Sequence, residues 1–237
     1  MNATQAGTTA DSACWSCRAA TRGEHFCPAC GKIQPLPRGA DYFAFFGLPG
    51  KLCLGEAELE KRFHELSWKL HPDNFVRASE YERELSLERS SQLNDAYRAL
   101  RDPIRRVEYL LARAGLRKEG QQKQQAPPEL LEEVFELNEW LDELRMVRQS
   151  SARSSDGAGE LAALRARLEA ARKNFEGKLG EVDAELAGVF AHWDAAVDAG
   201  ADEPARRKWM ERMNEILNRR SYIRNLVASV EKELAEA

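Results

Sequence analysis

The chain has 237 residues, of which 43% are hydrophobic and 31% are charged, with few glycines and prolines. This length allows one large or two small domains, and the composition is typical of a soluble, helix-rich protein without a disulfide scaffold. A formal charge of -4 disfavours a general nucleic-acid binder, because no overall basic field attracts phosphates. No apolar run approaches the roughly 18 residues of a membrane span. The first 13 residues hold no Arg or Lys, so we expect no signal or transit peptide and a reducing, cytoplasmic location.

Composition divides the chain into four parts. We expect a cysteine-rich head at residues 1–37, a first helical region at 41–116, a Gln-rich linker at 117–127 and a second helical region at 128–237. The linker has no apolar periodicity, and Pro128 can begin the helix that follows it.

The cysteine-rich head contains two C-x-x-C pairs. Cys14 and Cys17 form the first, Cys27 and Cys30 form the second, and nine residues separate them. Two such turns can close a tetrahedral shell around one zinc ion at about 2.3 Å per bond. Gly31 can adopt the positive φ that such a turn often needs after its second cysteine. Four thiolates leave no open coordination position, so this spacing predicts a structural zinc site.

Other interpretations of the head are weaker. A redox C-x-x-C pair normally opens a helix in a βαβ context that is missing here, whereas an iron–sulfur cluster can share this ligand spacing. A zinc-ribbon module for nucleic acid is disfavoured because the head has few basic and aromatic residues. His25 lies near the pairs, but an isolated loop histidine is more often solvated than ligating. Cys53 is remote from both pairs and is predicted to be a small, partly buried apolar residue.

Residues 56–70 show the pattern of an amphipathic helix. The apolar side chains that share one face, predicted to be buried, are Leu59, Phe63, Leu66 and Leu70. Three basic residues, Lys61, Arg62 and Lys69, lie within about 100° of each other on a different face, with Glu65 between them. By themselves these charges most simply form a solvated face. Trp68 falls outside the apolar stripe, so it either packs against a neighbouring domain or is exposed.

The tripeptide His71, Pro72 and Asp73, hereafter the His-Pro-Asp turn, follows this helix directly. Pro72 disfavours helix at the residue before it, so the helix should end here and expose a rigid turn. A second apolar stripe then predicts a helix that returns antiparallel to the first; its members are Leu93, Ala96, Tyr97 and Leu100. An enzyme with His71 and Asp73 as an acid–base pair is disfavoured, because no nucleophile, open metal position or phosphate loop accompanies them.

The second helical region contains long 3.6-residue periodicities. Its two later stripes are Leu161, Leu164, Leu168, Ala171, Phe175, Val182, Leu186, Val189 and Trp193, and then Trp209, Met213, Ile216, Ile223, Val227, Val230 and Leu234. Breaks rich in small or turn-forming residues at 150–159 and 199–204 predict loops between helices. Together with the helix that begins at Pro128, these stripes predict a three-helix bundle with its apolar residues in the core.

A helix, a His-Pro-Asp turn and an antiparallel helix together resemble a J-domain. The other J-like segments are Asp41-Tyr42-Phe43, Phe46-Gly47-Leu48, Leu93-Asn94-Asp95-Ala96-Tyr97 and Asp102-Pro103. The segment that resembles HscB and distinguishes it from other J-proteins consists of Arg105, Arg106, Glu108, Tyr109, Leu110, Leu111 and Gly115. The cysteine-rich head is similar to the zinc-knuckle extension of some members. The resemblance implies an all-α fold in which a J-domain helical hairpin is joined to a C-terminal three-helix bundle and a small N-terminal zinc-binding module.

The resemblance also implies a co-chaperone that is not an enzyme and has no catalytic residue. Its bundle would bind the iron–sulfur scaffold protein IscU and deliver it to an Hsp70-family chaperone of the HscA or DnaK type, whose ATPase it stimulates. The residues that would dock on this chaperone are Lys61, Arg62, Lys69, His71, Pro72 and Asp73. No nucleic acid or membrane partner is expected. The alternative is a general J-domain co-chaperone that serves unfolded clients.

The helix after Pro128 carries two apolar stripes, although one is enough for a core. The predicted buried seam is Leu130, Val134, Leu137, Leu141 and Leu144. Leu131 and Phe135 should be exposed beside acidic residues, as expected of an apolar anchor in a polar rim. The scaffold-binding residues that the resemblance implies are Leu131, Phe135, Glu136, Glu139 and Tyr222. The alternative is that Leu131 and Phe135 pack under the 150–159 loop or against the J-domain.

Overall fold

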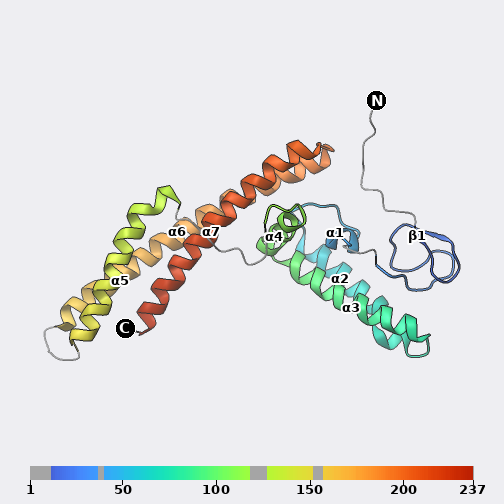
Figure 1. Ribbon diagram of the computed structural model, residues 1–237, viewed down its shortest axis with the longest axis horizontal. Helices are drawn as coiled ribbons and strands as arrows, with labels where there is room; N and C mark the ends of the chain where they lie inside the picture. The colour runs from blue at the N-terminus through green and yellow to red at the C-terminus, as the bar shows by residue number, and fades with distance from the viewer. Residues whose placement is uncertain (1–11, 37–39, 118–126, 152–156, 237) are drawn as a thin grey trace. The chain divides into compact units, whose positions relative to one another are not determined.

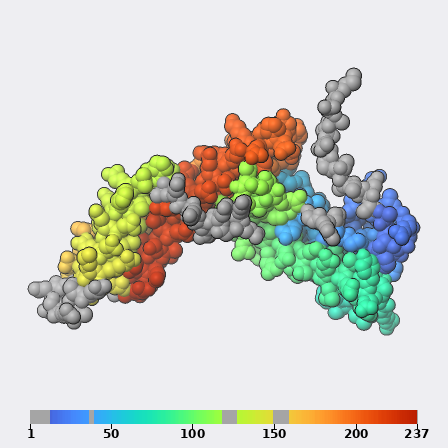
Figure 2. Space-filling view, in the orientation of Figure 1, coloured from blue at the N-terminus to red at the C-terminus, as the bar shows by residue number. Residues whose placement is uncertain are grey.

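The described residues of the computed structural model are 12–36, 40–117, 127–151 and 157–236. Figure 1 shows the helices and strands, and Figure 2 shows the described part of the chain in colour. The chain forms two compact units, Met1–Tyr109 and Leu110–Ala237. The predicted all-α class is confirmed, because helices build both units and the strands of the described residues are two short pieces in the head. The central parts of the predicted linker and of the 150–159 loop lie outside the described residues. The loop prediction is wrong for 150–151 and 157–159, which are helical.

The head contains a two-stranded antiparallel ribbon of β1 (Ser12–Ala13) and β2 (Ala20–Thr21). The helices that follow are α1 (Tyr42–Phe45), α2 (Glu56–Leu70), the 3-10 turn η1 (Pro72–Phe75), α3 (Glu80–Arg101) and α4 (Pro103–Arg113), whose last four residues belong to the second unit. α2 and α3 lie side by side and run antiparallel, as predicted (Figure 1). Of the four residues predicted to be buried on α2, Leu59 and Leu70 are buried, whereas Phe63 and Leu66 are half-buried. Phe63 stacks on Tyr97 at 4.2 Å between ring centroids.

The segment that resembles HscB explains how α4 is held. The buried Arg106 donates hydrogen bonds to the carbonyl of Leu100 at 2.7 Å and to the carbonyl of Leu52. The Tyr109 hydroxyl accepts the Tyr42 N–H at 2.8 Å, and the two rings stack at 4.4 Å. Because Leu52 and Tyr42 are distant in sequence, Arg106 and Tyr109 fix α4 against α1 and the loop before α2.

The second unit consists of the 3-10 turn η2 (Pro128–Leu130), α5 (Leu131–Ser151), α6 (Gly157–Asp198) and α7 (Glu203–Glu236). α6 packs against both α5 and α7, so the predicted three-helix arrangement is confirmed. The predicted break at 199–204 is confirmed for residues 199–202 and is wrong for the last two, because α7 already begins at Glu203. Gly200 has φ +62°, and the Ala201 N–H donates to the Ala196 carbonyl at 2.9 Å, which ends α6 in a Schellman turn.

α5 and α7 are also linked by charge. Glu233 on α7 is buried and lies 2.6 Å from Arg145 Nη2 and 3.1 Å from Arg148 Nη1. Hydrogen bonding from Arg145 lowers the pKa of Glu233, although burial opposes this effect. A buried carboxylate is stable only when such partners compensate its lost hydration.

Candidate metal centre and docking surfaces

The predicted metal ligands Cys14, Cys17, Cys27 and Cys30 come together in the head. Their Sγ atoms all lie within 4.8 Å of one another. The Sγ atoms of Cys14 and Cys30 are 3.7 Å apart, as are those of Cys17 and Cys27. Four bonds of about 2.3 Å to one tetrahedral ion require sulfur–sulfur separations of roughly 3.8 Å. The four thiols therefore fit a single tetrahedral metal ion.

The two C-x-x-C turns share one backbone design. The Arg18 N–H donates to the Cys14 carbonyl at 3.0 Å, and the Gly31 N–H donates to the Cys27 carbonyl at 2.9 Å. The residue after the second cysteine has positive φ in both turns, +64° at Arg18 and +71° at Gly31. The prediction for Gly31 is confirmed. Arg18 carried no sequence signal, because non-glycine residues rarely adopt this conformation.

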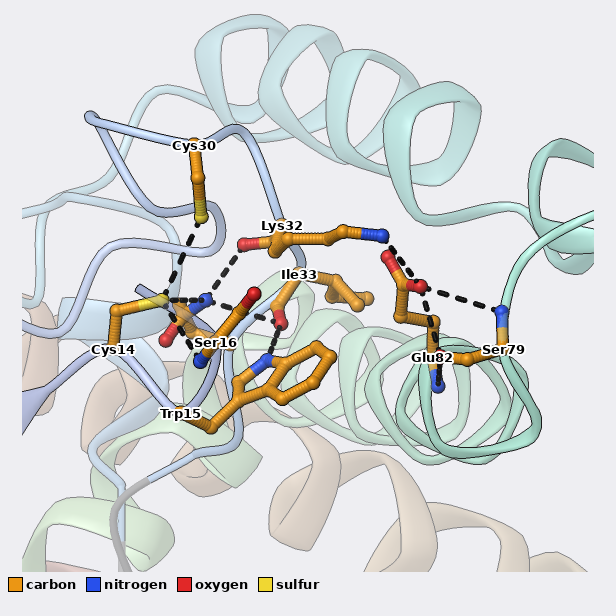
Figure 3. Close-up of polar contacts among 9 residues, drawn as sticks. Cys14, Trp15, Ser16, Cys30, Lys32, Ile33, Ser79 and Glu82 are labelled. Atoms are coloured by element: carbon orange, nitrogen blue, oxygen red, sulfur yellow. Dashed lines mark hydrogen bonds and ion pairs between the residues drawn. The ribbon is translucent and has the colours of Figure 1, made fainter. Parts of the chain in front are cut away.

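Several N–H groups point at the sulfur of Cys14, some of which are seen in Figure 3. Its Sγ accepts from the backbone N–H of Ser16 at 3.4 Å and of Cys17 at 3.5 Å, and from Gln34 Nε2 at 3.4 Å. Burial raises the pKa of the Cys14 thiol, but the N–H groups of Cys17 and Ser16 outweigh it and lower the pKa to about 6. These donors favour the thiolate, which is the form that binds a metal ion.

A salt bridge joins the head to the first turn of α3. Lys32 Nζ lies 2.8 Å from Glu82 Oε2 (Figure 3). Glu82 is buried and also accepts the hydroxyl of Ser79 at 2.9 Å, within the capping box that begins α3. The hydrogen bond from Lys32 lowers the pKa of Glu82 against the effect of burial. This ion pair therefore ties the head to the helical hairpin.

His25 is neither a metal ligand nor the solvated loop residue that was expected. Its Nε2 lies 2.8 Å from the Phe45 carbonyl, and its Nδ1 lies 2.8 Å from Arg89 Nη2 on α3. Burial and then the charge of Arg89 lower the pKa of His25 to about 4, so the imidazole is neutral at physiological pH. A neutral ring can donate from Nε2 to Phe45 and accept at Nδ1 from Arg89. His25 thus belongs to the packing between the head and α3.

Side chains from α3 hold the His-Pro-Asp turn in place. The hydroxyls of Ser86 and Ser90 both donate to the Leu70 carbonyl, at 2.8 Å and 3.0 Å. Asn74 Nδ2 donates to the Trp68 carbonyl at 2.6 Å. These bonds satisfy carbonyls that the end of α2 leaves without helical partners. The sequence prediction missed both serines, although two hydroxyls four residues apart on the apolar face of α3 were a usable signal.

The His-Pro-Asp turn itself is exposed, as predicted. The side chains of His71 and Asp73 are 55% and 84% exposed, and His71 Nδ1 accepts the Asp73 N–H at 3.3 Å. Both side chains can therefore reach a second molecule. A rigid and exposed turn of this kind is suited to contact between proteins.

The three basic residues of α2 differ in their surroundings. Lys61 and Lys69 are exposed. Arg62 is half-buried, donates to the Phe46 carbonyl at 2.8 Å, and lies 2.6 Å from Glu58 Oε1. The structure therefore uses Arg62 within its own unit and leaves the two lysines on the surface.

Two single-residue expectations are also decided. The prediction that Cys53 is partly buried is wrong, because the adjacent Leu52 takes the buried position in the loop before α2 and Cys53 is exposed. The side chain of Trp68 is 78% exposed. Of the two alternatives for Trp68, the structure of the first unit therefore supports exposure over packing.

The predicted scaffold-binding residues lie mostly on the surface of the second unit. Leu131 and Phe135 are 42% and 67% exposed, so the prediction of their exposure is confirmed for this unit. Glu136 and Glu139 are also exposed, and Tyr222 on α7 is half-buried. The predicted seam beneath them is buried except for Val134, which is half-buried; its buried members are Leu130, Leu137, Leu141 and Leu144. We call Leu131, Phe135, Glu136, Glu139 and Tyr222 the α5 patch.

An ion pair joins α7, near the patch residue Tyr222, to the residues just before α5. Arg219 Nη1 lies 3.5 Å from Glu129 Oε1. Arg219 precedes Tyr222 by one helical turn, and Glu129 lies just before Leu131. Tyr222 is thereby placed at the same end of the unit as Leu131.

A helical hairpin with an exposed His-Pro-Asp turn, joined to a tetracysteine head and followed by a three-helix unit, defines a J-domain co-chaperone. No protein-family model matches the sequence. The chain is 38% identical over 158 residues to a co-chaperone protein HscB homolog of Vibrio vulnificus, covering 67% of this chain and 85% of that protein. It resembles the crystal structure of human co-chaperone protein HscB with a TM-score of 0.60 and 25% identity, covering 94% of this chain and 98% of that chain. The chain belongs to the HscB family of co-chaperones.

None of the helices in the described part of the chain combines the length and apolar character required to span a membrane.

Proposed function

We propose that this protein binds an IscU-type iron–sulfur scaffold with its second unit and delivers it to an Hsp70-family chaperone of the HscA or DnaK type. The first unit then stimulates the ATPase of that chaperone. The observation that carries the proposal is the exposed His-Pro-Asp turn, fixed by α3 at the end of a helix with two exposed lysines. ATP hydrolysis itself belongs to the partner in this proposal.

Docking on the chaperone begins with electrostatic attraction. Lys61 and Lys69 lie exposed on α2 and attract an acidic surface, which raises the rate of encounter. The hydrogen bonds from Ser86 and Ser90 fix the turn before it binds, so less conformational entropy is lost on contact. Arg62 supports this face indirectly, by tying α2 to the end of α1.

Scaffold binding is assigned to the α5 patch. Leu131 and Phe135 supply an apolar anchor, and Glu136 and Glu139 supply a polar rim that excludes water around it. An exposed pair of large apolar side chains on one helix face is the kind of surface that marks a protein-binding site.

We assign the metal of the tetracysteine centre as structural zinc, because four thiolates leave it no open position. Reduced thiols of this kind suit a cytoplasmic location. The proposed domains are residues 1–37 for the zinc head, 41–116 for the J-domain, 117–127 for the linker and 128–237 for scaffold binding.

The test is the steady-state ATPase rate of a purified Hsp70-family chaperone, titrated with this protein in the presence of IscU. We expect the rate to rise several-fold, and His71→Gln should abolish the rise while scaffold binding and the unfolding temperature stay unchanged. His192→Gln is the matched control, because His192 is an exposed histidine on α6 that belongs to neither proposed binding surface. An unchanged response with His71→Gln contradicts the assigned turn, and stimulation without IscU binding indicates the general co-chaperone for unfolded clients.

A further inference from the structure

The outer face of α2 carries a large apolar side chain that has no role in the proposed function. Trp68 is 78% exposed, more than any other large apolar residue of the described chain. It lies about 160° to 180° around the helix from the buried Leu70 and Leu59, so it points away from the core of its unit. Its indole therefore contributes little to the packing of the first unit.

Trp68 sits at the edge of the basic face, beside Lys61, and next to the His-Pro-Asp turn. At 100° per residue it lies about 20° from Lys61 and about 100° from Lys69, both of which are exposed. Its carbonyl accepts the Asn74 amide at 2.6 Å, which fixes the backbone of Trp68 to η1. The ring is thus carried on a rigid support at a set position relative to the turn.

An exposed tryptophan beside cationic side chains has the features of a binding hot spot. Trp and other aromatic residues dominate the energetics of interface centres, where they bury about 150–250 Å² each. The two nearby lysines outnumber Glu65, the exposed carboxylate that lies between them, so they favour a partner that offers an apolar site bordered by acidic groups. A symmetric contact with a second copy of this face would bring the exposed lysines of both copies into one interface, where like charges repel.

We propose that Trp68 is the apolar anchor of the chaperone-docking face, and that the ATPase partner receives it in an apolar site with an acidic border. This inference rests on the proposed function. It divides the docking face into two roles. Trp68 and the lysines hold the complex together, whereas the His-Pro-Asp turn transmits the signal for hydrolysis.

The experiment is a titration of the chaperone ATPase with wild-type protein, Trp68→Ala and Trp68→Gln, in the presence of IscU. Both variants should raise the half-maximal concentration by about tenfold or more, as expected when a hot-spot side chain is lost. The maximal rate at saturation should stay at the wild-type value, unlike that of His71→Gln. Leu87→Ala is the matched control, because Leu87 is an exposed apolar residue on α3, and it should leave the titration unchanged.

Other outcomes overturn the inference. Equal half-maximal concentrations for both Trp68 variants and wild type contradict the anchor while leaving the proposed function in place. A wild-type dimer in sedimentation that Trp68→Ala converts to a monomer shows that the ring binds a second copy instead. A wild-type protein that stimulates no ATPase at any concentration overturns the inference together with the proposed function.

Discussion

Nδ1 of His25 lies 2.8 Å from Nη2 of Arg89, and this contact joins the tetracysteine head to the middle of α3. Arg89 is 1% exposed, and its guanidinium lies 5.4 Å from the centroid of the Phe45 ring. Burial lowers the pKa of Arg89 to about 10, and its Nε and Nη1 have no hydrogen-bond partner among the described residues. His25 thus accepts a hydrogen bond from a buried cation that is otherwise poorly compensated.

The first prediction concerns this contact. His25→Ala should lower the free energy of unfolding of the first unit by about 1–3 kcal/mol, because it leaves a buried donor unsatisfied. Urea unfolding followed by circular dichroism measures the loss. Arg89→Met combined with His25→Ala should recover part of it, since the cation is then removed as well. Zinc content serves as the control for the head, and unchanged stability in His25→Ala would show that the contact contributes nothing.

The second prediction concerns the metal. Purified protein should carry one zinc ion per chain, and Cys27→Ser should lose it, because three thiols no longer close the shell. Cys53→Ser is the matched control, since Cys53 lies outside the cluster, and it should keep full metal content. Metal analysis decides between the outcomes, and metal-free wild-type protein would contradict the assignment.

Metal loss should also weaken the helical hairpin. The helical signal at low temperature should remain nearly intact, because the head contains little helix. The unfolding temperature of the first unit should nevertheless fall after chelation, because Lys32 and His25 no longer hold α3. An unfolding temperature that does not respond to chelation would mean that the head adds no stability to the hairpin.

The third prediction concerns pH and the second unit. The folded-state pKa of Glu233 lies below its ordinary value because of Arg145, so this carboxylate stabilises the fold above its unfolded pKa of about 4.3. That stability should be lost as the pH falls through the folded-state pKa. Urea midpoints measured from pH 7 to pH 3 should fall less steeply in Glu233→Gln. Glu231→Gln, an exposed carboxylate of the same helix, should keep the wild-type profile; identical profiles for both variants would refute the role of Glu233.

The fourth prediction concerns the α5 patch. Leu131→Ala combined with Phe135→Ala should weaken IscU binding by about 2–4 kcal/mol while the unfolding temperature stays close to wild type, because both side chains are exposed. Isothermal titration calorimetry with IscU provides the measurement, and Leu87→Ala in the first unit provides the control. A double variant that loses thermal stability and still binds normally would show that these residues are core and that the scaffold binds elsewhere.

Local chemistry determines the helices, the end of α2 and the metal site of this protein without reference to tertiary contacts. The 3.6-residue spacing of apolar side chains marked the long helices, because a helix places such residues on one face whatever surrounds it. Pro72 determined the end of α2 by steric exclusion of helix at His71. The spacing of the four cysteines predicted the metal site, because each C-x-x-C turn aims its sulfurs within four residues.

Only the tertiary structure decided which distant groups meet. Ser86 and Ser90 reach the Leu70 carbonyl across 16 and 20 residues, and His25 reaches Arg89 across 64. Arg62 carries the same charge as its lysine neighbours, yet packing commits it to its own unit. Such pairings depend on how the helices pack. They also depend on where burial makes an unsatisfied hydrogen-bonding group costly. Local residue spacing encodes neither property.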